Sequence, residues 1–205
     1  MSRKNGFSYL PTGKRLVDVF LSLLVLPFQV VLFAPIAMMI KLDDGGPIFH
    51  LAARRGKDGV PFTMYKYRSM YVGSPDLRNP DRSTVTKQQD ARITKVGRVL
   101  RKTSLDELPQ FINVLKGDMS IVGPRPNLVG RPLEEFSELE KKRLAVKPGI
   151  TGMAQATSRN QAQTTEKYEL DCAYVDDVSL RNDLKIMLMT VVSVLKQRGI
   201  YSKTR

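Results

Sequence analysis

Residues 19–40 read VFLSLLVLPFQVVLFAPIAMMI and contain no charged side chain. A run of this length and composition can enter the hydrocarbon core of a bilayer. It is too long for the core of a signal peptide, and no small-x-small cleavage site precedes the segment Lys41–Asp44. The segment therefore predicts a chain that is bound to a membrane.

Two features bear on how this segment meets the membrane. Pro27 lies in its middle, where a proline removes a backbone hydrogen bond and bends a helix. Basic residues lie on both sides of the segment, which fits entry and exit through the cytoplasmic face. These flanking residues are Arg3, Lys4, Lys14 and Arg15 before it and Lys41, Arg54, Arg55 and Lys57 after it. A re-entrant helix–break–helix and a bent spanning helix both remain open.

Composition restricts the chemistry. The 205 residues include one histidine, His50, and one cysteine, Cys172, so a Ser-His-Asp relay, a Cys-His pair and a clustered zinc site are hard to assemble. We expect His50 to pack beside the apolar residues 47–49 and Cys172 to lie in the core. The net charge of +13 favours an anionic partner, such as nucleic acid, anionic lipid or a nucleotide-like substrate.

Asp106 and Glu107 are adjacent carboxylates in basic surroundings. They follow a stretch whose charges are all positive, namely Arg92, Lys95, Arg98, Arg101 and Lys102. Such surroundings lower carboxylate pKa values and attract phosphates, so the pair is expected to be ionised and close to a phosphate. Residues 104–107 also fit a capping box, in which Ser104 caps a helix and Glu107 reaches back to it. Both interpretations stay open for the isolated tetrapeptide.

The remaining pattern is mixed. Residues 47–51 and 62–70 predict two strands around a turn at 56–59, which makes a hairpin. In the second strand Lys66 and Arg68 alternate with tyrosines, and their side chains either line a site or face water. Residues 72–91 predict a loop, and helices are expected at 93–102, from Pro132, and at the C-terminal end, where Asn182 serves as the cap. The last helix carries an apolar stripe that suits either the core or lipid.

Several long motifs occur in order along nearly the whole chain. They are GPIF at 46–49, FTMYKYRSM at 62–70, SLDELPQ at 104–110, NVLKGDMS at 113–120, GPRP at 123–126 and KPGITG at 147–152. This series resembles the bacterial sugar transferases, specifically the monotopic phosphoglycosyl transferases. The chain departs from their pattern at Leu26, Ala52, Ala91 and Ser158, where Ser, Gln, Pro and Gly are usual.

The resemblance implies transfer of a sugar 1-phosphate from a UDP-sugar to polyprenyl phosphate, with UMP as the leaving product. It implies that Asp106 is the nucleophile and that Asp106 and Glu107 hold Mg²⁺. An ionised carboxylate needs no base to attack phosphorus, so the missing histidine relay is no obstacle. Substrate binding is expected at five basic residues, Lys66, Arg68, Arg101, Arg125 and Arg159.

The fold class implied is α+β, with a re-entrant membrane helix in residues 1–44 and a catalytic domain in residues 45–205 that carries interfacial amphipathic helices and a small β-hairpin. Its place would be the cytoplasmic face of a bacterial inner membrane, in contact with lipid. Nucleic acid is not expected as a partner, because Trp is absent and no aromatic side chains interleave with the basic stretches. A non-catalytic membrane scaffold is the other alternative. The identity of the sugar and the formation of a homo-oligomer are left open.

Overall fold

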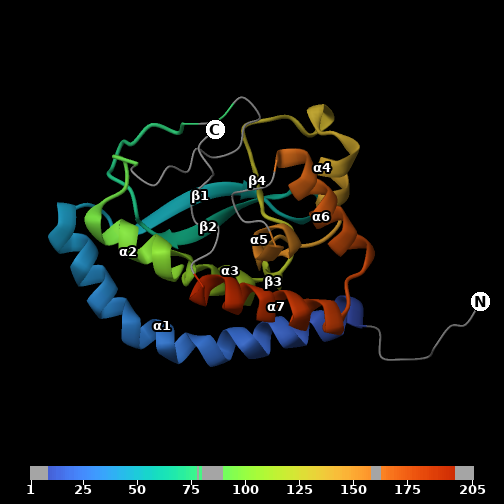
Figure 1. Cartoon of the computed structure of the whole chain (residues 1–205), viewed down its shortest axis with the longest axis horizontal. Helices are drawn as coiled ribbons and strands as arrows, with labels where there is room; N and C mark the ends of the chain where they lie inside the picture. Colours follow the sequence, from blue (N-terminus) through green and yellow to red (C-terminus); the bar gives the residue numbers. More distant parts are fainter. Residues whose placement is uncertain (1–8, 78, 80–89, 158–162, 197–205) are drawn as a thin grey trace, which may run out of the picture.

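The computed structural model describes residues 9–77, 79, 90–157 and 163–196, and it confirms the α+β class. Figure 1 shows a long N-terminal helix along the lower edge of the molecule and a small sheet above it, with shorter helices between the two and at the right. The helices are α1 (Lys14–Asp44), α2 (Lys95–Thr103), α3 (Gln110–Lys116), α4 (Glu138–Arg143), α5 (Met153–Thr157), α6 (Thr164–Asp176) and α7 (Leu180–Leu195). The strands are β1 (Phe49–Arg55), β2 (Pro61–Tyr67), β3 (Ser120–Val122), β4 (Asn127–Leu128) and β5 (Gly149–Thr151). Single helical turns are η1 (Tyr9–Gly13), η2 (Lys57–Gly59), η3 (Leu105–Glu107) and η4 (Leu133–Glu135).

Helix α1 contains the whole apolar run. The expected break at Pro27 is not present, because Pro27 and Pro35 both lie inside one continuous helix. Figure 1 shows this helix changing direction along its length, so the prolines bend the chain without ending the helix. The side chains that α1 buries recur at helical spacing and are Lys14, Asp18, Ser22, Gln29, Ile36, Ala37 and Ile40. Polar residues thus fill the first half of the buried stripe and apolar residues the second.

Polar contacts tie α1 to the rest of the molecule at both ends. Near the start, Lys14 Nζ lies 2.7 Å from a carboxylate oxygen of Asp183 in α7. In the middle, Gln29 donates a hydrogen bond to the carbonyl of Leu108. At the end, Asp44 forms an ion pair with Arg68. Since the same body holds both ends, α1 is packed onto the domain along its length.

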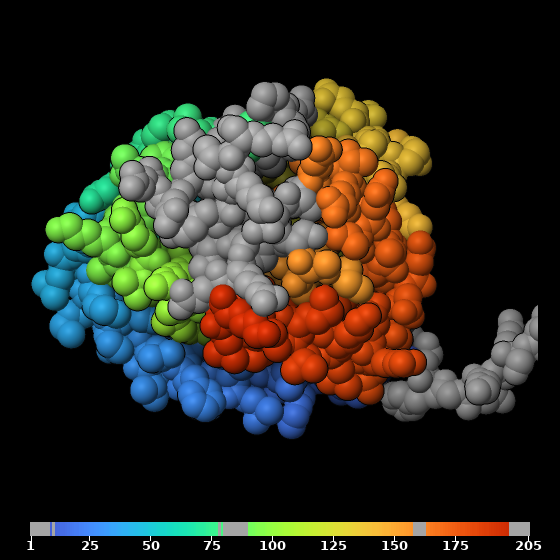
Figure 2. Space-filling view, viewed as in Figure 1, coloured from blue at the N-terminus to red at the C-terminus, as the bar shows by residue number. Residues whose placement is uncertain are grey.

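The outer surfaces of α1 and α7 are apolar. Within the described residues one helical segment, Pro11–Asp44, is long and apolar enough to cross a membrane by length and composition. Figure 2 shows α7 next to α1 along the lower edge of the molecule. Large exposed apolar residues on the two helices include Phe20, Phe28, Val31, Leu42, Leu184, Leu188 and Leu195. Exposed apolar surface of this extent marks a contact with lipid or protein.

The predicted hairpin is confirmed, with different limits. Strands β1 and β2 pair antiparallel from Phe49↔Tyr67 to Arg55↔Pro61, and the short strand β4 adds to β1. The outer edge of β2 is closed by Asn113 of α3, whose side chain accepts from Tyr65 N at 3.0 Å and donates to Thr63 O at 2.7 Å. A second sheet pairs β3 and β5 in parallel. The β1–β4 and β3–β5 pairings join segments distant in sequence, which local patterns do not reveal.

Helix starts differ from those expected. Helix α7 is capped by Ser179, whose side chain accepts from Asn182 N, so the prediction that Asn182 is the cap is wrong. The helix expected from Pro132 begins instead at Glu138, behind a capping box formed by Ser137 and Glu140. Ser179 and Ser137 have the extended backbone of an N-cap, so their hydroxyls reach free amides of the first helical turn. Cys172 is buried, as expected.

Candidate active site

The Asp106–Glu107 pair lies in a short turn between two helices. Ser104 ends α2 in the left-handed conformation, with φ 59°, and η3 follows it before α3 begins at Gln110. The Ser104 side chain makes no capping hydrogen bond to η3, so the capping-box interpretation is wrong. A capping serine needs an extended backbone, which the C-terminal position in α2 does not allow. The carboxylate pair is therefore not part of a capping box.

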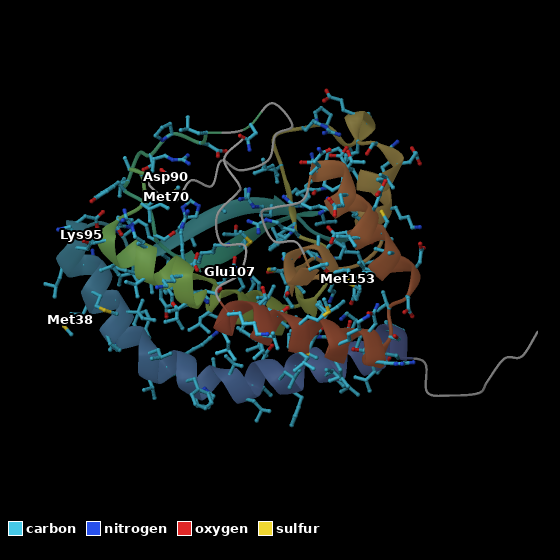
Figure 3. All side chains as sticks on the ribbon, viewed as in Figure 1. Met38, Met70, Asp90, Lys95, Glu107 and Met153 are labelled. Atoms are coloured by element: carbon cyan, nitrogen blue, oxygen red, sulfur yellow. The ribbon has the colours of Figure 1, made fainter. Side chains whose placement is uncertain are left out.

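Glu107 is held by a lysine from the hairpin. Lys66 Nζ in β2 lies 2.6 Å from Glu107 Oε1, and both side chains are partly buried. Figure 3 shows Glu107 near the middle of the molecule, between the helices and below the sheet. Lys66, one of the five basic residues expected at the site, is thus in contact with the carboxylate pair.

Asp106 is the buried member of the pair, with 9% of its surface exposed. Burial and then the adjacent charge of Glu107 raise the pKa of Asp106 to about 6, and the charges of Lys66 and Arg101 oppose the shift. The expectation that basic surroundings would lower this pKa is wrong. Desolvation and a neighbouring like charge outweigh the two cations. Asp106 is still mainly ionised near pH 7, and its charge is incompletely compensated.

Arg101 and Arg125 belong to the same electrostatic neighbourhood. Arg101 Nε donates to Ser69 Oγ at 2.8 Å. Burial lowers the pKa of Arg101, the charges of Asp106 and Asp90 oppose this, and the charges of Arg92 and Arg125 add to it. Arg125 itself is exposed. Arg101 is thus close enough to both Asp106 and Arg125 to feel their charges.

Arg68 is placed differently. It is 5% exposed, and its donors bond Asp44, Pro47 O at 2.6 Å and Met70 O at 3.1 Å. These contacts join the end of α1 to the end of the hairpin. Arg159, the fifth basic residue expected at the site, lies outside the described residues.

His50 is a neighbour of the site that the sequence did not predict. It is exposed instead of packed, and it is the direct partner of Lys66 across the antiparallel pair. Partial desolvation and the charges of Arg54, Lys66 and Arg101 lower the pKa of His50. A neutral imidazole therefore stands beside the lysine that holds Glu107. The strand register shows this neighbour, and the predicted limits of 47–51 and 62–70 did not fix that register.

The carboxylate pair suits a magnesium ion. No group of three or more His, Cys, Asp or Glu side chains with metal-binding geometry occurs in the part of the chain that the structure describes. Mg²⁺ is commonly bound by one or two carboxylates, with substrate phosphates and water completing the shell. The incompletely compensated charge of Asp106 and Glu107 fits that arrangement.

Comparison with known proteins extends over the same residues. The profile of the family described as "Bacterial sugar transferase" matches residues 9–197. An uncharacterized sugar transferase, EpsL of Bacillus subtilis, is 43% identical over 189 residues, covering 91% of this chain and 89% of the relative. The UDP-glucose:undecaprenyl-phosphate glucose-1-phosphate transferase of Escherichia coli is 42% identical over 196 residues, covering 92% of this chain. The undecaprenyl-phosphate galactose phosphotransferase of Salmonella typhimurium is 38% identical over 203 residues, also covering 92%.

The relatives differ in length and in the sugar that they are named for. This chain spans most of the Bacillus protein but 41% of the Escherichia and Salmonella proteins. One of those two is named for glucose and the other for galactose. The similarity therefore covers one region of the longer relatives and leaves the sugar undecided.

Proposed function

The chain belongs to the bacterial sugar transferase family and is a sugar phosphotransferase; from this we propose that it transfers a sugar 1-phosphate from a UDP-sugar to undecaprenyl phosphate, initiates synthesis of a surface glycan and releases UMP. The observation that carries the proposal is the buried Asp106, adjacent to Glu107 and surrounded by the charges of Lys66 and Arg101. A carboxylate near two cations is suited to attack on a phosphate group.

In the first step a carboxylate oxygen of Asp106 attacks the phosphorus that bears the sugar. The bond between this phosphorus and the oxygen of UMP breaks, and UMP leaves with the electron pair. The product is an acyl phosphate in which Asp106 carries the sugar phosphate. Lys66, Arg101 and Arg125 would bind the phosphate oxygens and offset the charge that develops on them.

In the second step an oxygen of undecaprenyl phosphate attacks the same phosphorus. The bond to Asp106 breaks, the carboxylate is regenerated, and undecaprenyl diphosphosugar leaves. The acceptor is already anionic, so neither step needs a strong base. This explains how a chain with a single histidine can carry out the reaction.

Asp106 and Glu107 are the residues that would hold Mg²⁺. A bound Mg²⁺ supplies positive charge that screens the repulsion between carboxylate and substrate and stabilises the leaving phosphate. Lys66 keeps Glu107 in a fixed position beside Asp106 through the 2.6 Å contact. The lysine thereby orients the metal-binding pair in addition to its contact with substrate.

We further propose that α1 enters and leaves the cytoplasmic leaflet of the inner membrane. A straight helix of 31 residues would be about 46 Å long, enough to separate its ends across a bilayer. Instead Lys14 and Asp44, at its two ends, bond Asp183 and Arg68 of the same body. Residues 1–44 would then form the anchor and residues 45–205 the catalytic part at headgroup level, where a water-borne UDP-sugar meets a lipid-borne acceptor.

The test of the reaction is UMP release from a panel of UDP-sugars by the full chain in nanodiscs that contain undecaprenyl phosphate. Intact-protein mass spectrometry without acceptor should show one sugar phosphate on the wild type and none on Asp106→Asn. UMP release by Asp106→Asn at the wild-type rate would overturn the proposed nucleophile. Lipid binding with no UMP release from any UDP-sugar would favour a non-catalytic scaffold.

The test of topology is cysteine labelling at Ser2→Cys and Ser202→Cys in a background where Cys172 is replaced by serine. Both positions should react with an impermeant reagent only when the cytoplasmic face is accessible. Labelling from opposite faces would show a spanning helix and overturn the re-entrant proposal.

A further inference from the structure

The loop Pro124–Arg125–Pro126 has few means of being held in place. Prolines have no backbone N–H, so the loop has one N–H, that of Arg125, which lies at the carboxylate of Asp171, and its other backbone contacts go through carbonyl oxygens. Gly149 N donates to Pro124 O at 3.0 Å, at the start of β5. The next carbonyl, that of Arg125, needs a donor from elsewhere in the molecule.

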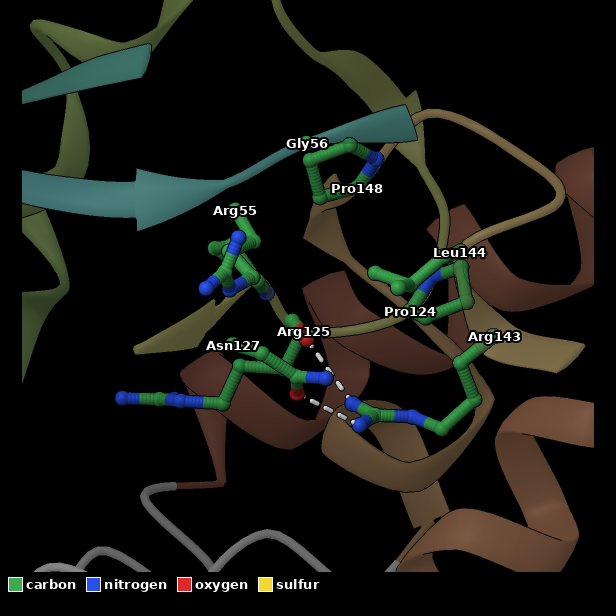
Figure 4. A pocket seen from close by; sticks show the side chains of 9 residues that line it. Arg55, Gly56, Pro124, Arg125, Asn127, Arg143, Leu144 and Pro148 are labelled. Carbon is green, nitrogen blue, oxygen red and sulfur yellow. Dashed lines mark hydrogen bonds between the residues drawn. The ribbon is translucent and has the colours of Figure 1, made fainter. Parts of the chain in front are cut away.

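Arg143 of α4 supplies that donor. One guanidinium nitrogen donates to Arg125 O at 2.8 Å and another to Asn127 Oδ1 at 2.6 Å. Figure 4 shows both contacts, with the Arg125 side chain extending from the loop away from Arg143. The planar fork therefore holds the loop from behind while Arg125 projects from its other side.

Arg143 is itself immobilised. Its Nε donates to Asp171 Oδ2 of α6 at 2.9 Å, and the two side chains are 4% and 2% exposed. Its guanidinium also stacks on the ring of Tyr168, at 4.4 Å from the ring centre. A buried guanidinium between a carboxylate and an aromatic ring has little conformational freedom. Arg143 therefore holds the loop in a fixed place relative to α4 and α6.

We propose that Arg143 is a positioning residue for donor binding, which acts by fixing the Pro124–Pro126 loop so that Arg125 presents its charge to the UDP-sugar. This inference rests on the proposed function, because it takes Arg125 as a contact of the donor phosphates. The residue touches no reacting atom. Its substitution should therefore weaken donor binding more than it slows the chemical steps.

The chain offers a matched control in Arg131. Arg131 also pairs with a carboxylate, Glu140 at 2.6 Å, and stacks on an aromatic ring, that of Phe136. It lies in the same region but shows no bond to residues 124–127 among the contacts of the described residues. Arg143→Lys and Arg131→Lys each remove a fork that pairs with a carboxylate and lies over an aromatic ring, and the Arg131 side chain is the more exposed of the two, at 22% against 4%.

The kinetic experiment measures UMP release against donor concentration by the full chain in nanodiscs. Arg143→Lys should raise the donor KM about tenfold with kcat within about threefold of wild type, whereas Arg131→Lys should change neither by more than about twofold. In an Arg125→Ala background, Arg143→Lys should add less than about twofold to KM. An Arg143→Lys effect of undiminished size in that background would overturn the proposal.

A second variant and a second measurement cover the case in which Arg143→Lys does not fold. Asn127→Ala removes one of the two loop contacts and leaves the Arg143–Asp171 pair, so it should raise KM by a smaller factor in the same direction. Hydrogen exchange of a peptide covering residues 124–129 should be faster in Asn127→Ala and Arg143→Lys than in Arg131→Lys. Equal exchange in all three variants would refute the tether, and this readout needs no turnover, so it remains interpretable if the proposed function fails.

Discussion

Two buried carboxylates, Asp106 and Asp171, show how the same residue type serves different ends. Burial raises the pKa of both. At Asp171 the strongest opposing influence is Arg143, which also donates a hydrogen bond at 2.9 Å. At Asp106 the second influence after burial is the like charge of Glu107, and the nearest lysine bonds Glu107.

The two carboxylates differ in the charges beside them, and this difference separates a structural role from a catalytic one. A buried charge with a hydrogen-bonded opposite charge is balanced within the fold, and removal of either partner leaves the other exposed to the full cost of burial. A buried charge next to a like charge is balanced only when a cation or an electrophile arrives. We therefore expect Asp171 to support the fold and Asp106 to carry the reaction.

The largest expected effect is that of Asp106→Asn on the reaction. Loss of the nucleophile should reduce UMP release by roughly 10³-fold or more and abolish the covalent adduct. The melting temperature should stay equal to that of the wild type or rise, because an uncompensated buried charge has been removed. UMP assays and thermal unfolding in detergent micelles measure the two quantities. A large fall in melting temperature would show that Asp106 belongs with Asp171 as a structural residue.

Asp171→Asn should show the opposite pattern. It leaves the Arg143 guanidinium buried without its carboxylate, and such losses cost roughly 3–5 kcal/mol of folding free energy. The melting temperature should fall markedly, while the folded fraction still forms the adduct at saturating donor. Thermal unfolding and intact-mass analysis of the same sample test this. Loss of adduct from fully folded protein would contradict the division of roles.

The pH dependence of the two sites should differ through Asp106. Its pKa is raised to about 6, so kcat should fall below that pH as the nucleophile becomes protonated. Stability runs the other way, because the raised pKa gives a contribution that is present below the ordinary value of 3.8 and is lost as pH rises through 6. The unfolding free energy of the wild type should therefore decline relative to Asp106→Asn between about pH 4 and 7. A constant difference across that range would show that the pKa of Asp106 is not raised.

The features that the sequence predicted are those that local chemistry decides. The apolar residues 19–40 specify a helical segment, although the expected break at Pro27 is not present, and the glycines around residues 56–59 specify a hairpin turn. The position of the carboxylate pair followed from a long motif in which Asp106 and Glu107 are consecutive. None of these features depends on which distant segments come together.

The features that the sequence did not predict depend on contacts between segments that are far apart in the chain. The direction of the pKa shift at Asp106 follows from burial between β2 and α2, whose residues lie on either side of a long connection. The same holds for Arg68, which meets Asp44 of α1, and for Arg143, which meets Asp171 and Arg125. Charge signs along a chain indicate which groups attract, but the fold decides which of them meet.

The smallest expected effect is that of Lys66→Met on the pH dependence of kcat, which tests how the pKa of Asp106 is set. Lys66 opposes the rise in its pKa, so Lys66→Met should raise that pKa further and displace the acid limb of kcat to higher pH. At saturating donor, kcat should be severalfold below wild type at pH 6, with a deficit that shrinks as the pH rises to 8. Lys116→Met is the matched control, since Lys116 pairs with Asp118 at 3.2 Å in an exposed position. A deficit independent of pH would mean that Lys66 contributes by orienting Glu107 or binding phosphate, and that its charge does not tune the nucleophile.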